Sequence, residues 1–377
     1  MFHRPLPLIA LLLVCSPVWA QEASEQFKHW DLDQDGKLIK AELPEFLRPL
    51  FDQIDANHDG FVSPAEDRQF VQRFAARQGQ TPQFQAARIP DSVQAEIDVP
   101  YAETDNPRQR LDLFLPKSPR SDKSLPVVAY IHGGGWQGGD KRGGSGVVAP
   151  LVASGEYAGV SIGYRLSGEA IWPAQIHDCK AAIRWIRANA KKYNLDPDRI
   201  GVTGGSAGGH LVAMLGTTGD VSALEGNLGE HTGVSSRVTC VVDQFGPADL
   251  LTMGGWHNGP TSPEARLLGG AIPDNQEQAQ AASPITYVSK DDPPFMMIHG
   301  TNDPLVPFNQ SEQLLAALRK AGAEAVLIPV EGGEHGNFGT PEVPLRLRQF
   351  FDKYLRAQDV SISTEPIKAA SARRPSN

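Results

Sequence analysis

The chain has 377 residues, of which 40% are apolar and 21% charged, with 37 glycines and 30 prolines. This composition excludes a wholly disordered, collagen-like or coiled-coil protein, and the length predicts two domains or one large domain with an attachment. The net charge of −9 argues against nucleic acid or anionic lipid as the main partner. Residues 22–67 hold 12 acidic and four basic residues, a net charge of −8, so we expect a separate acidic module near the N-terminus.

Residues 1–20 have the pattern of a secretory signal peptide. Arg4 precedes an apolar run from Leu8 to Val14, and Val18 and Ala20 place small residues where a signal peptidase cleaves. The run is shorter than the roughly 20 apolar residues that a spanning helix needs. We therefore expect cleavage after Ala20, a periplasmic or secreted protein and no membrane insertion of the mature chain. An uncleaved membrane anchor is the alternative.

Two twelve-residue segments, 31–42 and 55–66, have the pattern of EF-hand calcium loops. Both carry oxygen-bearing side chains at positions 1, 3 and 5, glycine at 6, an apolar residue at 8 and glutamate at 12. Ca²⁺ prefers six to eight oxygen ligands, the glycine permits the sharp turn, and position 7 contributes only its carbonyl. We expect two structural Ca²⁺ ions, with the ligands Asp31, Asp33, Asp35, Lys37, Glu42, Asp55, Asn57, Asp59, Phe61 and Glu66.

The segment between the two loops is short and contains proline. Pro49 cannot lie inside a helix without breaking it, so we expect two short helices with a break near Arg48. Leu38 and Val62, at position 8 of each loop, should join the loops through a short strand contact. The spacing also resembles that of dockerin modules, which bind a partner protein, but glutamate at position 12 favours an EF-hand pair.

From residue 93 onward, short β-rich runs alternate with helical patterns. This alternation predicts an α/β fold with a mostly parallel, eight-stranded sheet and helices on both faces. Cys179 falls in a predicted helix and Cys240 in a predicted buried strand, which favours two reduced thiols; a single disulfide is the alternative. The expected strands are 95–99, 111–115, 127–132, 159–164, 200–203, 238–245, 295–299 and 325–330, and the main helices are 174–192, 310–321 and 341–356.

Residues 200–210 predict a strand, a glycine-rich turn and the start of a helix. Gly204–Gly208 fits the G-x-S-x-G nucleophile elbow, whose small residues let backbone pack on backbone and hold Ser206 on an exposed corner. Three glycines also follow His132 at the end of another predicted strand, where they expose backbone N–H groups to a developing oxyanion. His132 itself is expected to shape this loop. The expected oxyanion-hole donors are the amides of Gly134, Gly135 and Ala207.

A catalytic triad of this type follows the chain order nucleophile, acid, base. Asp303 comes just after one predicted strand, and His335 comes after the next, on a glycine-rich loop. Asp303 would orient the imidazole of His335, which takes the proton of Ser206 and returns it to the leaving alcohol. The alternative acids are Glu334 and Asp291, and His299 is expected to be structural.

With these motifs, residues 93–356 resemble α/β-hydrolases of the hormone-sensitive-lipase-like group, and within it bacterial bifunctional feruloyl and acetyl xylan esterases. The stretches 132–141 (HGGGWQGGDK), 199–211 and 303–307 carry much of the resemblance. It implies a serine esterase that forms an acyl-enzyme from short-chain or aromatic esters, including acetyl or feruloyl groups on plant polysaccharide, without a catalytic cofactor. A peptidase or amidase with the same triad and a catalytically silent binding module are the alternatives.

The resemblance also implies a cap over the site, formed by residues 248–281. Its shortage of long apolar runs argues against a lid for long acyl chains. Trp136, beside the oxyanion loop, is expected either to stack on an aromatic acyl group or a sugar, or to pack structurally. The predicted organisation is a signal peptide (1–20), an EF-hand pair (21–76), a linker (77–92), a catalytic domain (93–357) and a disordered tail (358–377).

Overall fold

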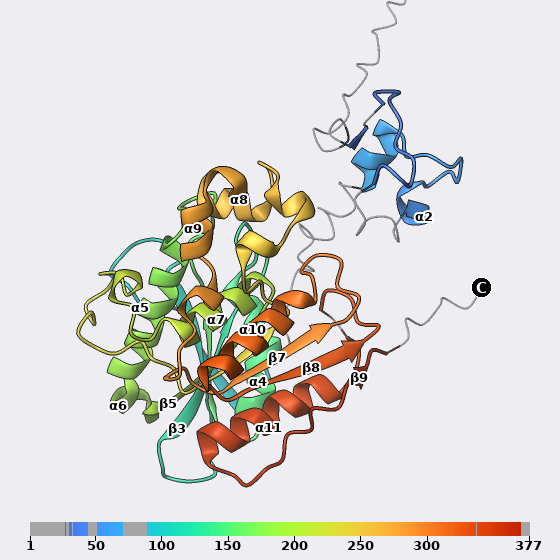
Figure 1. Cartoon of the computed structure of the whole chain (residues 1–377). Coiled ribbons are helices and arrows are strands. Elements are labelled where there is room, and N and C mark those ends of the chain that lie inside the picture. The colour runs from blue at the N-terminus through green and yellow to red at the C-terminus, as the bar shows by residue number, and fades with distance from the viewer. Residues whose placement is uncertain are drawn as a thin grey trace, which may run out of the picture. The chain divides into compact units, whose positions relative to one another are not determined.

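The chain divides into two compact units, residues 1–75 and 76–377 (Figure 1). The predicted signal peptide, the predicted break near Arg48 and most of the predicted linker lie outside the residues that the structure describes. No helix within the described residues combines the length and apolarity needed to cross a bilayer. The computed structural model describes residues 27, 30, 31, 33–43, 51–70, 89–336 and 338–370.

In the first unit, a short antiparallel bridge joins Leu38 to Val62. Each residue donates its backbone N–H to the carbonyl of the other, at 2.9 and 2.8 Å. The bridge confirms the contact expected between the eighth positions of the two loops. Around it lies a small core made of Phe27, Leu38, Leu43, Phe51, Ile54 and Val62, of which Phe51 and Ile54 belong to helix α2 (Phe51–Ile54).

The second unit is built on one nine-stranded sheet with the order β1-β2-β4-β3-β5-β6-β7-β8-β9. β2 runs antiparallel to both of its neighbours, and all pairings from β4 through β3 to β9 are parallel. The strands are β1 (Val93–Pro100), β2 (Arg110–Pro116), β3 (Leu125–Ile131), β4 (Ala158–Ile162), β5 (Leu195–Gly205), β6 (Cys240–Gln244), β7 (Phe295–Gly300), β8 (Ala325–Glu331) and β9 (Ile367–Lys368).

The ninth strand corrects the sequence prediction of eight strands and a disordered tail. β9 lies in the segment 358–377, and Ile367 pairs with Val330 of β8. The Ile367 side chain is only 4% exposed. The buried Ile367 side chain and the pairing with the open edge of β8 order this polar segment. A two-residue strand is too short to show a periodic apolar pattern, so the sequence did not predict it. The expectation of disorder is therefore wrong as far as residue 370, and residues 371–377 lie outside the described chain.

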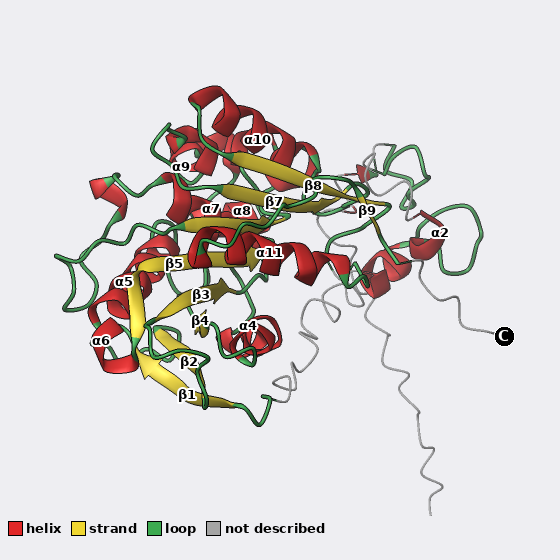
Figure 2. Cartoon of the chain, turned by 90° about the horizontal axis from the view of Figure 1, so that it is seen from below, coloured by secondary structure: helices red, strands yellow, loops and turns green. Residues whose placement is uncertain are grey.

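Helices cover both faces of the sheet, as Figure 2 shows. The apolar residues of α11 recur at helical spacing and pack on one face together with α4. The helix expected over 174–192 is divided at Asn189 into two helices. Together with the sheet order, this is the α/β-hydrolase fold. One face carries α4 (Ser145–Val152) and α11 (Glu342–Arg356), and the other carries α5 (Ala174–Ala188), α6 (Ala190–Tyr193), α7 (Ala207–Thr217) and α10 (Asn309–Ala321).

The expected cap is a run of short helices between β6 and β7. It includes α8 (Pro263–Leu268) and α9 (Gln276–Ala281), which lie together at one end of the unit in Figure 1. Cys179 in α5 and Cys240 in β6 are both buried and form no disulfide, which agrees with the expectation of two reduced thiols.

Candidate active site

Ser206 stands at the sharp corner between β5 and α7. Its backbone has φ 57° and ψ −124°, a region that non-glycine residues rarely occupy. Larger residues cannot replace the surrounding glycines, because a Cβ on Gly204 would lie 2.5 Å from the carbonyl oxygen of Gly208. A Cβ on Gly208 would lie 2.1 Å from the carbonyl oxygen of Ile131. The tight backbone packing therefore holds Ser206 in its strained conformation.

The loop that follows β3 lies directly against this corner. A Cβ on Gly133 would lie 2.7 Å from the carbonyl oxygen of Gly205 and 3.4 Å from the Cβ of Ser206. Gly134 and Gly135 have φ of 112° and 56°, and within the described residues neither backbone N–H has an acceptor. The N–H of the first residue of α7 has no acceptor within its own helix. Free amides are therefore available beside Ser206.

His335 and Asp303 form the hydrogen bond that the sequence predicts. His335 Nδ1 lies 2.7 Å from Asp303 Oδ2, and the Asp303 side chain is fully buried. Asp303 Oδ1 accepts the backbone N–H groups of Leu305 and Val306 at 2.8 and 2.9 Å. Because a carboxylate accepts, the imidazole hydrogen lies on Nδ1 and Nε2 is left to take a proton. The alternative acids, Glu334 and Asp291, are both exposed.

A second imidazole contacts the same carboxylate. His299 Nε2 lies 3.3 Å from Asp303 Oδ2, and His299 Nδ1 lies 2.8 Å from Ser311 Oγ. Burial raises the pKa of Asp303, but the hydrogen bonds from His299 and His335 outweigh it and hold this pKa well below its usual range. This contact of His299 was not predicted, and its only signal in the sequence is the position of His299 four residues before Asp303.

One cavity of about 420 Å³ brings the predicted site residues together. The ring of Phe245 packs edge-on against His335, with ring centroids 4.8 Å apart. Ser206 Oγ has no hydrogen-bond partner among the described residues, as is common in free enzymes whose contacts tighten when substrate binds. Of the predicted residues, Ser206, His335, Gly134, Gly135 and Ala207 all line this cavity, and Asp303 lies behind His335.

His132 and Trp136 have structural contacts. Burial lowers the pKa of His132 to about 4, and its ring stacks on Tyr164 with centroids 4.3 Å apart. Trp136 is 1% exposed, and its Nε1 donates to Nδ1 of His210 at 3.2 Å. Trp136 therefore packs within the protein, although part of its surface lines the cavity.

The wall of the cavity formed by the cap carries a polar pair that the sequence did not predict. His257 and Glu264 both line the cavity, and Nδ1 of His257 lies 2.9 Å from Oε1 of Glu264. The two residues are seven positions apart on two separate short helices of the cap, so no continuous helical repeat predicts their contact.

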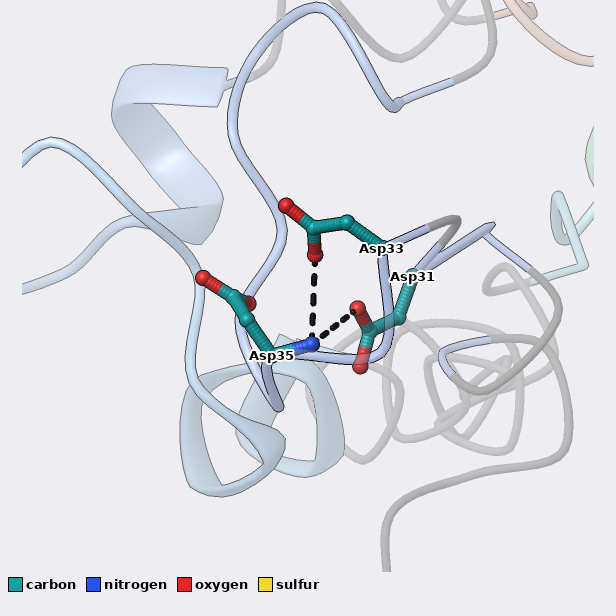
Figure 3. Close-up of side chains that lie close together, drawn as sticks. All are labelled: Asp31, Asp33 and Asp35. Atoms are coloured by element: carbon teal, nitrogen blue, oxygen red, sulfur yellow. Dashed lines mark hydrogen bonds between the residues drawn. The ribbon is translucent and has the colours of Figure 1, made fainter.

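In the first unit, the carboxylates of the first loop converge. Asp31, Asp33 and Asp35 each offer an oxygen within 4.8 Å of the others, and Figure 3 shows them gathered around one turn of the backbone. The Asp35 N–H donates to Asp31 and Asp33 at 3.1 Å each. In the second loop, the Asp59 N–H likewise donates to Asp55 at 3.1 Å and to Asn57 at 2.9 Å. Both loops thus gather the oxygen atoms that Ca²⁺ prefers.

The other loop positions also match between the two loops. Gly36 and Gly60, at position 6, have φ of 80° and 92°. The closing glutamates, Glu42 and Glu66, each accept the N–H of the residue at position 9, at 2.9 Å in both loops. The side chains at position 7 contact each other, with Lys37 Nζ 3.9 Å from the centre of the Phe61 ring, so these residues offer a metal only their carbonyls.

Curated relatives match part of the second unit. Esterase LipQ of Mycobacterium tuberculosis is 34% identical over 231 residues, which cover 61% of this chain and 54% of that protein. Esterase LipC of the same organism is 34% identical over 242 residues, covering 62% of this chain and 58% of that protein. The chain thus spans little more than half the length of the curated relatives it matches.

Solved structures are similar over a larger share of their length. A structure described as a truncated form of carbohydrate esterase from gut microbiota has a TM-score of 0.67 and 36% identity, and the match covers 71% of this chain and 98% of that one. Esterase B from Lactobacillus rhamnosis has a TM-score of 0.63 and 27% identity, with 78% and 96% covered.

Two family models match the chain. The EF-hand model matches residues 47–71, which contain the second predicted calcium loop, 55–66. The BD-FAE model matches residues 111–318, more than half of the chain, from the second strand of the sheet to α10. The chain therefore belongs to the BD-FAE family.

Proposed function

We propose that the second unit is a serine esterase that cleaves carboxylic esters through an acyl-enzyme on Ser206. His335 Nε2 takes the proton from Ser206 as its Oγ attacks the ester carbonyl, and the amides of Gly134, Gly135 and Ala207 stabilise the oxyanion. The tetrahedral intermediate collapses, and the alcohol leaves with the proton from His335. Water activated by the same imidazole then releases the acid and restores Ser206. Asp303 fixes the tautomer and stabilises the imidazolium.

One observation carries this proposal. His335, hydrogen-bonded to Asp303, lines the same cavity as the strained corner of Ser206, although Asp303 and His335 follow Ser206 by about 100 and 130 positions in the chain. The unpaired backbone N–H groups beside Ser206 can stabilise an oxyanion, which distinguishes an acyl-transfer site from a purely structural glycine-rich turn. The relatives named esterases and the similar carbohydrate esterase structure support the same chemistry.

The proposed substrates are short-chain or aromatic carboxylic esters, including acetyl or feruloyl groups on plant polysaccharide. The cavity of about 420 Å³ is large enough for one small acyl group or ring. We further propose that the protein is exported to the periplasm or beyond, since residues 1–20 have a signal-peptide pattern. N-terminal sequencing of the mature protein checks this, with Gln21 as the expected first residue.

The substitution Ser206→Ala tests the esterase proposal. Turnover of p-nitrophenyl acetate should fall to the level that binding and the oxyanion hole alone sustain, about 10³–10⁴ over water. Full activity in this variant would end the proposal. Comparing ester with anilide turnover on one sample of the unaltered protein separates an esterase from an amidase or peptidase.

We also propose that the first unit binds two structural Ca²⁺ ions. The residues fit this metal, because hard carboxylate and amide oxygens converge in the first loop and recur at matching positions in the second. Asp31, Asp33, Asp35 and Glu42 would hold one ion, and Lys37 would add its carbonyl. In the second loop the corresponding residues are Asp55, Asn57, Asp59, Phe61 and Glu66.

A further inference from the structure

The cap closes the cavity with a buried polar pair instead of a purely apolar wall. His257 and Glu264 are 4% and 3% exposed, and the Nδ1 to Oε1 contact between them measures 2.9 Å. Both residues line the cavity that also contains Ser206 and His335. The esterase chemistry proposed above uses neither of them.

The pair lies close to the oxyanion loop. A Cβ on Gly135 would lie 3.2 Å from the Cβ of Pro263, the residue before Glu264. Arg266, also in α8, donates from Nη1 to Oε1 of Gln137 at 2.6 Å. These contacts fasten α8 to the loop that carries the oxyanion-hole amides, so a group bound by the pair lies within reach of an ester held at Ser206.

Two acceptor atoms of the pair are unused. The Glu264 carboxylate accepts from Nδ1 of His257, so Nδ1 carries the hydrogen and Nε2 is an acceptor. Within the described residues, Nε2 of His257 has no hydrogen bond, and Oε2 of Glu264 is buried without a partner. Buried polar atoms in proteins are almost always paired, so such an atom in a cavity wall calls for a ligand group. Since both free atoms accept, the complementary group is a donor.

We propose that His257 and Glu264 form a specificity subsite that binds a hydroxyl group on a ring of the ester substrate. The proposal rests on the esterase function proposed above. Trp256 also lines the cavity and lies beside His257, with ring centroids 4.0 Å apart, so the wall next to the pair is aromatic, as suits an ester that carries a ring. The ring is either a phenol on the acyl side or a sugar on the alcohol side, and both present the same O–H donor.

Two pairs of esters that differ in ring hydroxyls distinguish these sources. The phenol arm compares methyl 4-hydroxycinnamate with methyl cinnamate, and the sugar arm compares monoacetylated methyl xyloside with cyclohexyl acetate. In at least one arm, the wild-type kcat/KM should favour the hydroxylated ester about 10- to 100-fold, as one hydrogen bond to a carboxylate gives. Using a ratio cancels any general loss of catalytic activity, because both esters of a pair undergo the same reaction at Ser206.

His257→Phe and Glu264→Gln should each reduce that ratio to within about twofold of one, since the acceptor is removed or its orientation lost. Glu277→Gln is the matched control, because Glu277 is an exposed acidic residue of the same cap, on α9, and should leave the ratio at its wild-type value. Thermal melting of each variant reports whether the fold is intact.

Each outcome decides the proposal. A wild-type ratio near one in both arms, or a preference that both variants keep, overturns the subsite and leaves the pair as a structural contact. The esterase function survives that result, because hydrolysis itself is still observed. If the wild-type protein cleaves no ester at all, the esterase function fails, and the subsite fails with it.

Discussion

Ser206 shows how a single residue can be strained and still firmly held. This backbone conformation costs a non-glycine residue about 1–3 kcal/mol, so contacts with neighbouring residues must make every other conformation of Ser206 less favourable. They do so with backbone atoms, because any side chain at Gly204 or Gly208 would overlap a carbonyl oxygen. The G-x-S-x-G pattern is readable in the sequence for this reason: the contacts leave no room for anything larger than hydrogen.

At the residue scale, Asp303→Asn should lower kcat for p-nitrophenyl acetate by about 10³–10⁴. The amide can donate to Nδ1 of His335 and so stabilise the wrong tautomer, with the hydrogen on Nε2. Steady-state kinetics at pH 7 measures the loss. Glu334→Gln is the control, since Glu334 is the exposed neighbour of His335, and its kcat should stay close to the wild-type value.

The same substitution should also change the acid stability. The pKa of Asp303 is lower in the folded state, so its hydrogen bonds stabilise the fold above the unfolded carboxyl pKa of about 3.9. That stabilisation is lost as the pH falls through the lower folded value. Unfolding followed from pH 5 downward should therefore show a smaller decline in Asp303→Asn than in the wild-type protein. An equal decline in both would contradict this role.

The role of a residue was predictable where a sequence motif defines it. It was not predictable where the role depends only on a tertiary contact. The hydrogen bond between Asp303 and His335 was predictable because each residue follows a strand in the order that a triad requires. The contact of His299 with Asp303 joins a strand end to the loop after it, and that of His257 with Glu264 joins two short helices of the cap. A single spacing of four or seven residues across such a boundary is not a repeated helical or strand pattern, so it could not predict either contact.

At the scale of elements, the parallel sheet explains why scattered segments meet. Ser206 follows β5, His335 follows β8, and the oxyanion glycines follow β3, all at the carboxyl ends of parallel strands. Such ends lie along one edge of the sheet, where ligands bind in open α/β folds. The first eight strands were predictable, most of them from buried apolar runs, although β1 has only one buried residue. The two-residue β9 was not, because its partner strand and one side chain order it.

Ile367→Ala tests the importance of β9. The substitution should lower the free energy of unfolding by about 2–3 kcal/mol, at the lower end of the range for buried isoleucine, because β9 lies at the sheet edge. Chemical denaturation measures the change. The neighbouring Lys368→Ala removes an exposed side chain from the same strand and should change stability by less than about 0.5 kcal/mol. Equal effects of the two would show that β9 contributes no packing.

On the scale of the whole molecule, the chain combines two units with separate cores and separate chemistry. None of the ten predicted calcium ligands is one of the predicted catalytic residues, Ser206, Asp303 and His335. The net charge is unevenly distributed between the units, since residues 22–67 carry almost all of the net negative charge. The division was predictable from charge and loop spacing alone, because each calcium loop is a local sequence feature that needs no distant contact.

Calcium removal should therefore affect stability more than catalysis. Chelation with EDTA should lower the melting temperature of the first unit, because an ion at 10 to 100 times its Kd contributes about 1.4–2.7 kcal/mol per site. Most turnover of p-nitrophenyl acetate should remain. Differential scanning calorimetry and an ester assay on the same full-length sample measure both effects.

A variant that lacks the first ligand of each loop provides the control. Asp31→Asn combined with Asp55→Asn should melt at the same temperature with and without EDTA. Activity that disappears on chelation and returns with added Ca²⁺ would contradict the separation and show that the two units are energetically coupled.

The bridge between Leu38 and Val62 has a consequence for how the two loops fill. Its paired hydrogen bonds tie the eighth residue of one loop to the eighth residue of the other. A cation that immobilises either loop also restricts its neighbour, so the second cation meets a segment with less freedom left to lose. A calorimetric titration should accordingly rise more steeply than two independent isotherms, with a Hill coefficient above one.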